Sequence, residues 1–342
     1  MLLEEIRREI AANGGWISFA RYMELASRAY YGRDDRQFGP RGDFVTAPEL
    51  GSLFGRTLAR QLAALEGPIL EFGAGSGALA AVLTQELDRE YFILETSAAL
   101  KARQAERLGS RVKFLDALPA EFRGVIVANE VVDAMPVHAV GWRESGIVER
   151  GVSAELAWDE RPAHGAVLQA ALEIEVPAPY DSEIGLAGQA WMRTLGERLA
   201  RGAIFIIDYG FPRHEYYHPQ RAMGTLMCHA RHRAHGNPFD RPGEQDITAH
   251  VDFSALARCA QETGLEVLGY ANQAQFLVNC GITEVLAQAN LENALHYAPI
   301  ASEAQILLSP SEMGELFKVL AVGRGIGKPL LGFSRGERSN TL

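Results

Sequence analysis

Ile69-Leu70-Glu71-Phe72-Gly73-Ala74-Gly75-Ser76-Gly77 is the stretch of this chain that most strongly constrains its fold. A short, mostly apolar run leads into a glycine-rich turn, and residues 78–87 then have the composition of a helix. Glycines let the backbone approach a ligand closely, and the first turn of a helix offers free N–H groups. The stretch therefore predicts a strand, a ligand-binding turn and a helix in succession.

Short apolar runs recur after this turn, and helical stretches such as 98–108 separate most of them. The runs lie at residues 69–72, 91–94, 112–115, 125–128 and 203–207, with two further strand candidates at 265–270 and 317–322. Unbroken apolar runs are typical of parallel strands that are buried on both faces. We therefore predict an α/β fold, with a doubly wound, Rossmann-like sheet.

The flanking segments predict the domain organisation. Residues 1–66 have apolar positions at helical spacing and form an N-terminal helical region, in which Ser18 caps a helix that begins at Phe19. Residues 67–342 form the sheet domain. Insertions interrupt it at about 137–200, with extra strands and a helix at 189–201, and at about 210–250, which is polar. Asp252 is expected to cap a later helix.

Composition excludes several classes of function. The net charge of -10 and the pI near 5.5 argue against general binding to nucleic acid or an anionic membrane, because such surfaces need an excess of Lys and Arg. Three scattered cysteines do not form a disulfide framework. The first ten residues are rich in acids and lack an apolar stretch, and no later run has the length of a membrane span. We expect a cytoplasmic, bacterial protein.

The acids around the glycine turn indicate the ligand. Glu95 ends the next strand, where a carboxylate accepts hydrogen bonds from ribose hydroxyls, and Asp116 ends the third strand, near an adenine amino group. The spacing also satisfies the dinucleotide pattern GxGxxA. Glu71 favours S-adenosyl-L-methionine, because it would repel a pyrophosphate and attract an ammonium. The predicted cofactor contacts from the turn are Glu71, Gly73, Gly75 and Gly77.

Polar residues follow the fourth and fifth strands, where ligands bind in open α/β sheets. Asn129, Glu130 and Asp133 follow the fourth strand, and Asp208 ends the fifth. Carboxylates can hold a guanidinium bidentately and orient it for methyl transfer. We therefore predict Glu130, Asp133 and Asp208 as catalytic residues, with His138 as proton acceptor and Asn129 as a cofactor contact. The structural alternative is that Asp133 caps a helix and Asp208 pairs with an arginine.

Histidines and a cysteine cluster in the second insertion. Cys228, His229, His232 and His235 match no zinc spacing, and neighbouring arginines would oppose a cation. We predict a mobile lid or a substrate loop here, with a metal site as the weaker alternative.

Blocks along nearly the whole chain resemble the MidA-like family of methyltransferases. The blocks are residues 42–49, 53–55, 71–77, 129–137, 208–210, 224–226, 243–253 and 313–320. The resemblance implies a class I methyltransferase sheet and cofactor contacts from residues 42–49, among them Asp43, Phe44, Thr46 and Pro48. Mitochondrial members methylate an arginine of a respiratory complex I subunit, which implies a protein arginine as acceptor by analogy.

Four functions remain open at this point. The first is protein-arginine methylation. The second is methylation of another nucleophile, such as a small-molecule amine. The third is an assembly factor that binds the cofactor for stability and acts by holding a partner protein. An NAD-dependent dehydrogenase is the fourth and weakest. The sequence does not determine the oligomeric state.

Overall fold

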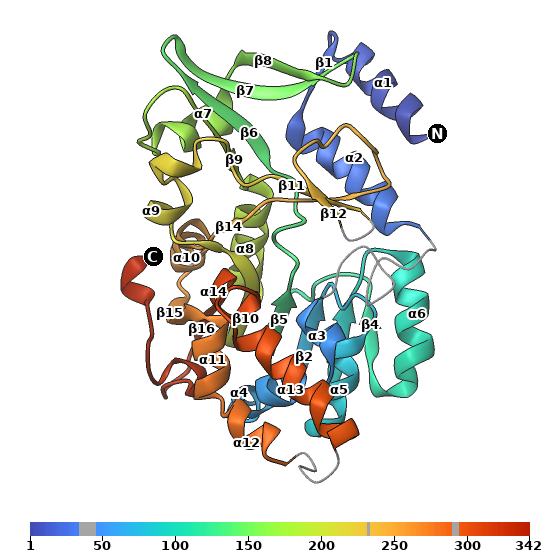
Figure 1. The fold of residues 1–342 in the computed structure, drawn as a ribbon, viewed down its shortest axis with the longest axis vertical. Coiled ribbons are helices and arrows are strands. Elements are labelled where there is room, and N and C mark those ends of the chain that lie inside the picture. Colours follow the sequence, from blue (N-terminus) through green and yellow to red (C-terminus); the bar gives the residue numbers. More distant parts are fainter. Residues whose placement is uncertain (34–45, 231–232, 289–293) are drawn as a thin grey trace.

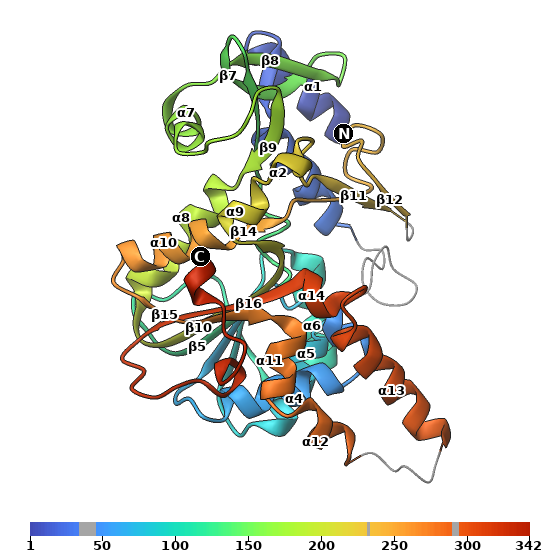
Figure 2. The same cartoon turned by 60° about the vertical axis from the view of Figure 1, so that its left-hand side comes forward.

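The computed structural model describes residues 1–33, 46–230, 233–288 and 294–342. A large part built on the main sheet carries a smaller part, which we call the cap (Figures 1 and 2). The cap contains the elements α1 (Leu2–Ala12), β1 (Trp16–Ser18), α2 (Phe19–Tyr31), β6 (His138–Arg143), β7 (Gly146–Ser153), β8 (Trp158–Pro162), α7 (Gly165–Leu172), β9 (Tyr180–Ile184), β11 (Met227–Ala230), β12 (Arg233–His235) and β13 (Asp246–Thr248).

The main sheet confirms the predicted doubly wound fold. Its strand order is β15-β16-β10-β5-β2-β3-β4, and β14 (Val251–Asp252) pairs with the end of β10. The strands span β2 (Ile69–Phe72), β3 (Tyr91–Leu94), β4 (Lys113–Leu115), β5 (Phe122–Asn129), β10 (Leu199–Phe211), β15 (Glu266–Asn272) and β16 (Phe317–Arg324). The predicted strands are all present, and the central strands β2, β5 and β10 have the apolar runs that burial on two faces requires.

One strand of this sheet runs against the others. β16 is antiparallel to both β10 and β15, although its run is mostly apolar and buried like those of the central parallel strands. An apolar run indicates that a strand is buried on both faces, but it does not indicate whether the strand is parallel or antiparallel to its neighbours. The sheet is therefore mixed, and parallel from β10 to β4.

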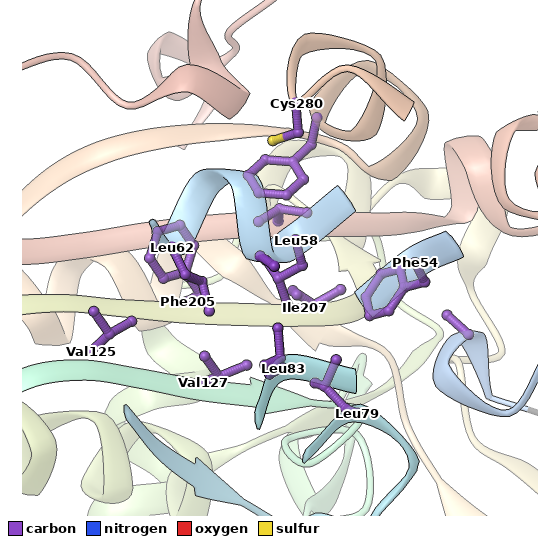
Figure 3. Packing of buried hydrophobic residues seen from close by; sticks show 14 of the residues in the cluster. Phe54, Leu58, Leu62, Leu79, Leu83, Val125, Val127, Phe205, Ile207 and Cys280 are labelled. Carbon is purple, nitrogen blue, oxygen red and sulfur yellow. The ribbon is translucent and has the colours of Figure 1, made fainter. Parts of the chain in front are cut away.

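Helices cover both faces of the sheet. One face packs against α4 (Leu53–Leu62), α5 (Ala78–Glu86), α11 (Gln273–Asn279), α12 (Ile282–Leu286) and α13 (Ala294–Leu308), and Figure 3 shows this core. The other face packs against α8 (Leu186–Arg198) and α10 (Phe253–Glu262). Successive strand residues point to opposite faces, so Val125 and Val127 enter the first core and Ile126 the second. The remaining helices are α3 (Ala47–Leu50), α6 (Ala98–Leu108), α9 (Arg213–Tyr216) and α14 (Met313–Leu316).

The N-terminal region differs from an all-helical prediction. β1 interrupts it and pairs antiparallel with β7 of the first insertion. Three residues between two helices are too short to show a strand period, which is why the pattern missed them. Apolar side chains of α1 and α2 pack on this insertion, whereas α4 packs on the main sheet. The Ser18 and Asp252 caps are confirmed, because each side chain accepts a backbone N–H at its helix start.

The helix expected at 189–201 ends earlier. α8 stops at Arg198 and β10 begins at Leu199, so β10 is a 13-residue strand that continues beyond the sheet edge. Its last residues, Gly210 and Phe211, pair with β14. Within the described residues, no helix is both long enough and apolar enough to cross a membrane.

Candidate active site

A cavity of about 1100 Å³ lies between the carboxyl edge of the main sheet and the cap. Its walls come from the glycine turn, from the segments that follow β3 and β5, and from α2 and β11 of the cap. The described lining residues carry an excess of negative charge. The carboxylates are Glu24, Glu49, Glu71, Glu95, Glu130, Asp133 and Asp246, and the guanidinium groups are Arg28 and Arg221. Such a lining favours a cationic ligand.

The glycine turn forms the floor of the cavity. Gly73, Gly75 and Gly77 all have positive φ, which favours glycine. Gly73 and Gly75 line the cavity, whereas Gly77 lies at the start of α5 and does not. Glu71 is buried at the end of β2, and its Oε2 accepts a 2.8 Å hydrogen bond from the hydroxyl of Tyr91. Burial raises the pKa of Glu71 to about 7, so an ammonium beside it would favour its charged form.

Glu95 is held in place at the cavity wall after β3. Its Oε1 accepts the backbone N–H of Ser97 at 2.8 Å, and its Oε2 accepts a hydrogen bond from Nε2 of Gln104 at 3.0 Å. The same Nε2 donates to the carbonyl of Gly75 at 2.9 Å. Gln104 therefore links the predicted ribose carboxylate to the glycine turn. No sequence motif points to Gln104, because its contacts depend on how α6 packs.

Residues 46–49, which follow the undescribed segment 34–45, complete the cofactor side of the cavity. Thr46 and Pro48 line the cavity, as the resemblance implied, and Asp43 and Phe44 lie outside the described residues. Glu49, which was not predicted, also lines it and accepts a hydrogen bond from the Ser76 hydroxyl.

The predicted adenine contact, Asp116, is not brought to the cavity. Its side chain is 94% exposed and lies 2.8 Å from Nζ of Lys101 on α6. This ion pair lowers the pKa of Asp116. The carboxylate of Asp116 therefore faces solvent and pairs with α6, and it does not line the cavity.

Glu130 has an unusual backbone conformation. Its φ is +53°, and among described residues other than glycine only Leu156 is also positive. Strained backbone of this kind concentrates at functional sites. Glu130 lines the cavity, and its Oε1 accepts a 3.1 Å hydrogen bond from Nδ2 of Asn129, which also lines it. Burial, reinforced by the nearby charge of Asp133, raises the pKa of Glu130 to about 8.

Asp208 lies beneath the turn that carries Glu130, and the prediction that it holds the acceptor is corrected. Its Oδ2 accepts backbone N–H groups of Val131, Val132 and Asp133 at 3.2, 3.0 and 3.3 Å. The side chain is fully buried and does not line the cavity. Burial raises the pKa of Asp208 well above its ordinary value. Asp208 is a positioning residue, because the N–H groups of the turn need an acceptor there.

Asp133 reaches the cavity from the same turn. Its Oδ2 accepts a hydrogen bond from the hydroxyl of Tyr209, which also lines the cavity. Its Oδ1 is buried without a hydrogen-bond partner among the described residues, as is Oδ1 of Asn129. Burial raises the pKa of Asp133 to about 6. Two acceptor atoms are therefore left for a ligand that donates hydrogen bonds.

His138 does not reach this centre, which corrects its predicted role as proton acceptor. It starts β6, and its Nδ1 lies 2.7 Å from Oε1 of the buried Glu149. Two histidines line the cavity, His229 of β11 and His250, and the ring of His250 packs edge-on against Tyr209. Burial lowers the pKa of His250 to about 4, so its ring is neutral at pH 7.

Asp246 adds a carboxylate from the second insertion. It is buried, lines the cavity and contributes to raising the pKa of Glu130. The hydroxyl of Tyr31 on α2 donates to its Oδ1 at 2.8 Å. In the histidine-rich segment, Cys228 and His229 lie on β11 and His235 on β12, whereas His232 lies outside the described residues. The described residues contain no cluster of three side chains suited to holding a metal.

The residues present fit S-adenosyl-L-methionine, which carries a sulfonium, an ammonium and a ribose. Buried carboxylates and unpaired acceptor oxygens suit its cationic groups and its donors. A model of the Methyltransf_28 family, described as S-adenosyl-L-methionine-dependent methyltransferases, matches residues 53–271. The chain belongs to this family. It is thus a methyltransferase, with S-adenosyl-L-methionine as its cofactor.

Curated relatives of this methyltransferase include mitochondrial proteins. The protein arginine methyltransferase NDUFAF7 of Danio rerio is 29% identical, over 94% of this chain and 86% of that protein. Its homologue in Drosophila melanogaster is 27% identical, over 97% of this chain and 88% of that protein.

Solved structures support the same assignment. A protein from Burkholderia thailandensis, crystallised with S-adenosyl-homocysteine, is 48% identical, with a TM-score of 0.95 over 100% of this chain and 96% of that one. A native crystal structure from the same organism has a TM-score of 0.92 at 47% identity, with the same coverage. The fold is that of a class I methyltransferase.

Proposed function

We propose that this methyltransferase transfers the methyl group of S-adenosyl-L-methionine to an arginine side chain of a partner protein. The observation that carries the proposal is a set of three carboxylates that line the cavity, the half-buried Glu130 and the buried Asp133 and Asp246. The names of the NDUFAF7 relatives support the same acceptor.

A guanidinium suits these carboxylates better than a neutral acceptor does. Burial keeps the pKa of Glu130 at about 8 and that of Asp133 at about 6, so their negative charge is costly in the empty cavity. A cation that arrives between them favours the charged forms, and a planar guanidinium can donate to both carboxylates at once. The unpaired Oδ1 of Asp133 gives it one acceptor.

The proposed chemistry needs orientation and a place for one proton. When bound, the cofactor supplies an electrophilic methyl group on its sulfonium. The carboxylates fix the guanidinium in line with that methyl and concentrate electron density on the attacking nitrogen. The proton released from that nitrogen can be taken up by Glu130, because this carboxylate lines the cavity beside Asp133.

The test is to identify the acceptor directly. A lysate from cells that lack the protein is incubated with the enzyme and labelled S-adenosyl-L-methionine, and labelled species are analysed by mass spectrometry. We expect label on arginine in a protein band, absent with the Glu130→Gln variant. Label on a small molecule, or on a different side chain, would replace the arginine proposal. Cofactor binding without any transfer would favour an assembly factor.

A further inference from the structure

Exposed apolar side chains lie on segments that line the cavity. In the described part of the chain eight large apolar side chains are exposed, and three of them, Met223, Met227 and Leu316, lie on or beside cavity-lining segments. Met227 and Leu316 line the cavity, and Met223, which is 86% exposed, directly precedes the lining residue Gly224. A cluster of exposed apolar side chains of this kind marks an interaction site.

A chain of contacts connects these segments with the acceptor carboxylates. The Tyr209 hydroxyl donates to Asp133, and the Tyr209 ring packs against Phe317 at 5.5 Å between centroids. Phe317 directly follows Leu316. On the other side Tyr209 contacts His250 at 5.2 Å, and the backbone N–H of His250 donates to Oγ1 of Thr225 at 3.0 Å. Thr225 lies two residues after Met223. Tyr209, with its ring neighbours Phe317 and His250, therefore connects the segments that carry the apolar rim to Asp133.

The rim itself is held rigidly. Glu183 is buried and accepts both the backbone N–H and the Oγ1 hydroxyl of Thr225 at 2.9 Å, which positions the segment that carries Met223. Lys318 is buried and donates to the carbonyls of Glu315 and Leu316, which close the end of α14. Both segments are thus fixed, and only the apolar side chains on them remain adaptable.

We infer that this rim, Met223, Met227 and Leu316, docks an extended protein segment in which the target arginine has aliphatic neighbours. The inference rests on the proposed arginine acceptor. The carboxylates lie inside the cavity, so an arginine must insert its long side chain while its backbone stays at the mouth. Its neighbours then meet the three apolar side chains. Unbranched methionines adapt to different aliphatic partners, and the acidic interior complements the inserted cation.

Arg221 does not neutralise the acceptor carboxylates, so a bound ligand can supply the positive charge that they need. Arg221, which lines the same cavity, stacks over the ring of Phe211 with its guanidinium carbon 4.0 Å from the centroid. It also donates to the carbonyl of Tyr216 at 3.4 Å. Arg221 is directed along the wall and not toward the carboxylates, so it leaves Asp133 for the acceptor.

The test measures peptide binding and does not require turnover. The protein, saturated with S-adenosyl-homocysteine, is titrated into fluorescent nine-residue peptides that contain one arginine between two leucines or between two serines. Matched peptides carry lysine in place of arginine. We expect the leucine-flanked arginine peptide to bind at least about tenfold more tightly than the serine-flanked one in an anisotropy assay.

Variants assign the effect to the rim. Met223→Ser combined with Leu316→Ser should abolish the leucine preference. Leu172→Ser, which replaces a 60% exposed leucine on α7 away from the cavity, should retain it. All these side chains are exposed, so the variants should fold, and melting curves check this. An unchanged preference in the double variant, no preference in the wild type, or no peptide binding overturns the docking inference.

The lysine peptides separate this inference from the proposed function. If leucine flanks favour lysine as strongly as arginine, the docking surface stands and the arginine proposal fails. If arginine is preferred over lysine without regard to its flanks, the arginine proposal stands and the docking surface is overturned.

Discussion

Tyr31 and Asp246 are 215 residues apart in sequence, and the phenolic hydroxyl of Tyr31 donates a 2.8 Å hydrogen bond to Oδ1 of Asp246. The backbone carbonyl of the same Tyr31 accepts a 2.6 Å hydrogen bond from Oγ of Ser97, which follows the cofactor carboxylate Glu95. One residue of α2 thus contacts the cofactor side of the cavity through its backbone and the acceptor side through its side chain.

Tyr31→Phe should therefore affect the acceptor and spare the cofactor. It removes the hydrogen bond to Asp246 and leaves the backbone bond to Ser97 unchanged. We expect kcat/KM for the acceptor to fall about tenfold or more, because a hydrogen bond to a charged group contributes about 1.5–3 kcal/mol. Affinity for S-adenosyl-homocysteine should stay within about twofold, as measured by calorimetry. Tyr91→Phe is the matched control, since it removes the bond to Glu71 and should weaken cofactor binding instead.

Glu95→Ala should weaken cofactor binding about tenfold or more while the protein remains folded. The change removes the carboxylate that Gln104 and the N–H of Ser97 hold toward the cavity. Asp116→Ala provides the contrast, because this carboxylate is exposed and paired with Lys101. Calorimetry that shows equal losses for both variants would place the adenosine differently from our assignment.

Glu130→Gln should reduce kcat about a hundredfold or more and leave cofactor affinity unchanged. The amide keeps the shape of the side chain but removes the charge that would orient a guanidinium, and it presents an N–H to another donor. The control is Glu24→Gln, which changes a cavity carboxylate on α2 that is already engaged by Arg21. Near-normal transfer by Glu130→Gln would contradict the carboxylate clamp.

Two substitutions of Asp208 distinguish a positioning role of this residue from a catalytic role. Asp208→Ala leaves the N–H groups of residues 131–133 without their acceptor, so we expect a lower melting temperature and a large loss of kcat. Asp208→Asn should restore most of both, because an amide oxygen can accept the same bonds. Its neutral side chain also matches a carboxyl whose pKa is raised well above the ordinary value. An Asn variant as inactive as the Ala variant would show that the charge itself is required.

Stability should depend on pH through Glu71. Burial raises its pKa from an ordinary value of 4.5 to about 7, so between these pH values the folded chain keeps a proton that the unfolded chain has lost. The free energy of unfolding therefore falls as pH rises through this window. Denaturant unfolding at pH 5 and at pH 8 measures this effect. The free energy of unfolding should fall between the two pH values by about 2–3 kcal/mol more in the wild type than in Glu71→Gln. Parallel curves for the two proteins would contradict the shift.

Local patterns predicted the sheet and the cofactor loop well, because these depend on short stretches. The apolar run before Gly73 and the acid at its end are readable from nine consecutive residues. The same reasoning located Glu130 and Asp133 at a strand end, and both line the cavity. Whether they act on an arginine stays a prediction.

Side-chain direction and long-range contacts could not be predicted in this way. Asp208 and Tyr209 are adjacent, yet the first turns to the backbone of a neighbouring turn and the second to the cavity. The direction of each side chain depends on which backbone N–H groups of the neighbouring segment lack a hydrogen-bond acceptor. Asp246 was missed for a related reason, because the packing of β13 beside α2 brings it to the cavity.

The length of β10 limits how substrates and products can be exchanged. This strand is hydrogen-bonded to β5 and β16 within the main sheet, and it continues without a break to Phe211, where it pairs with β14 beneath the cap. Phe211, at the end of β10, packs against an apolar cluster that contains Val140 and Tyr180 of the cap, so swinging the cap away as a hinged lid would expose this cluster. We therefore expect release of the methylated product to proceed through side-chain movement at the rim, with the protein keeping nearly the same radius of gyration throughout turnover.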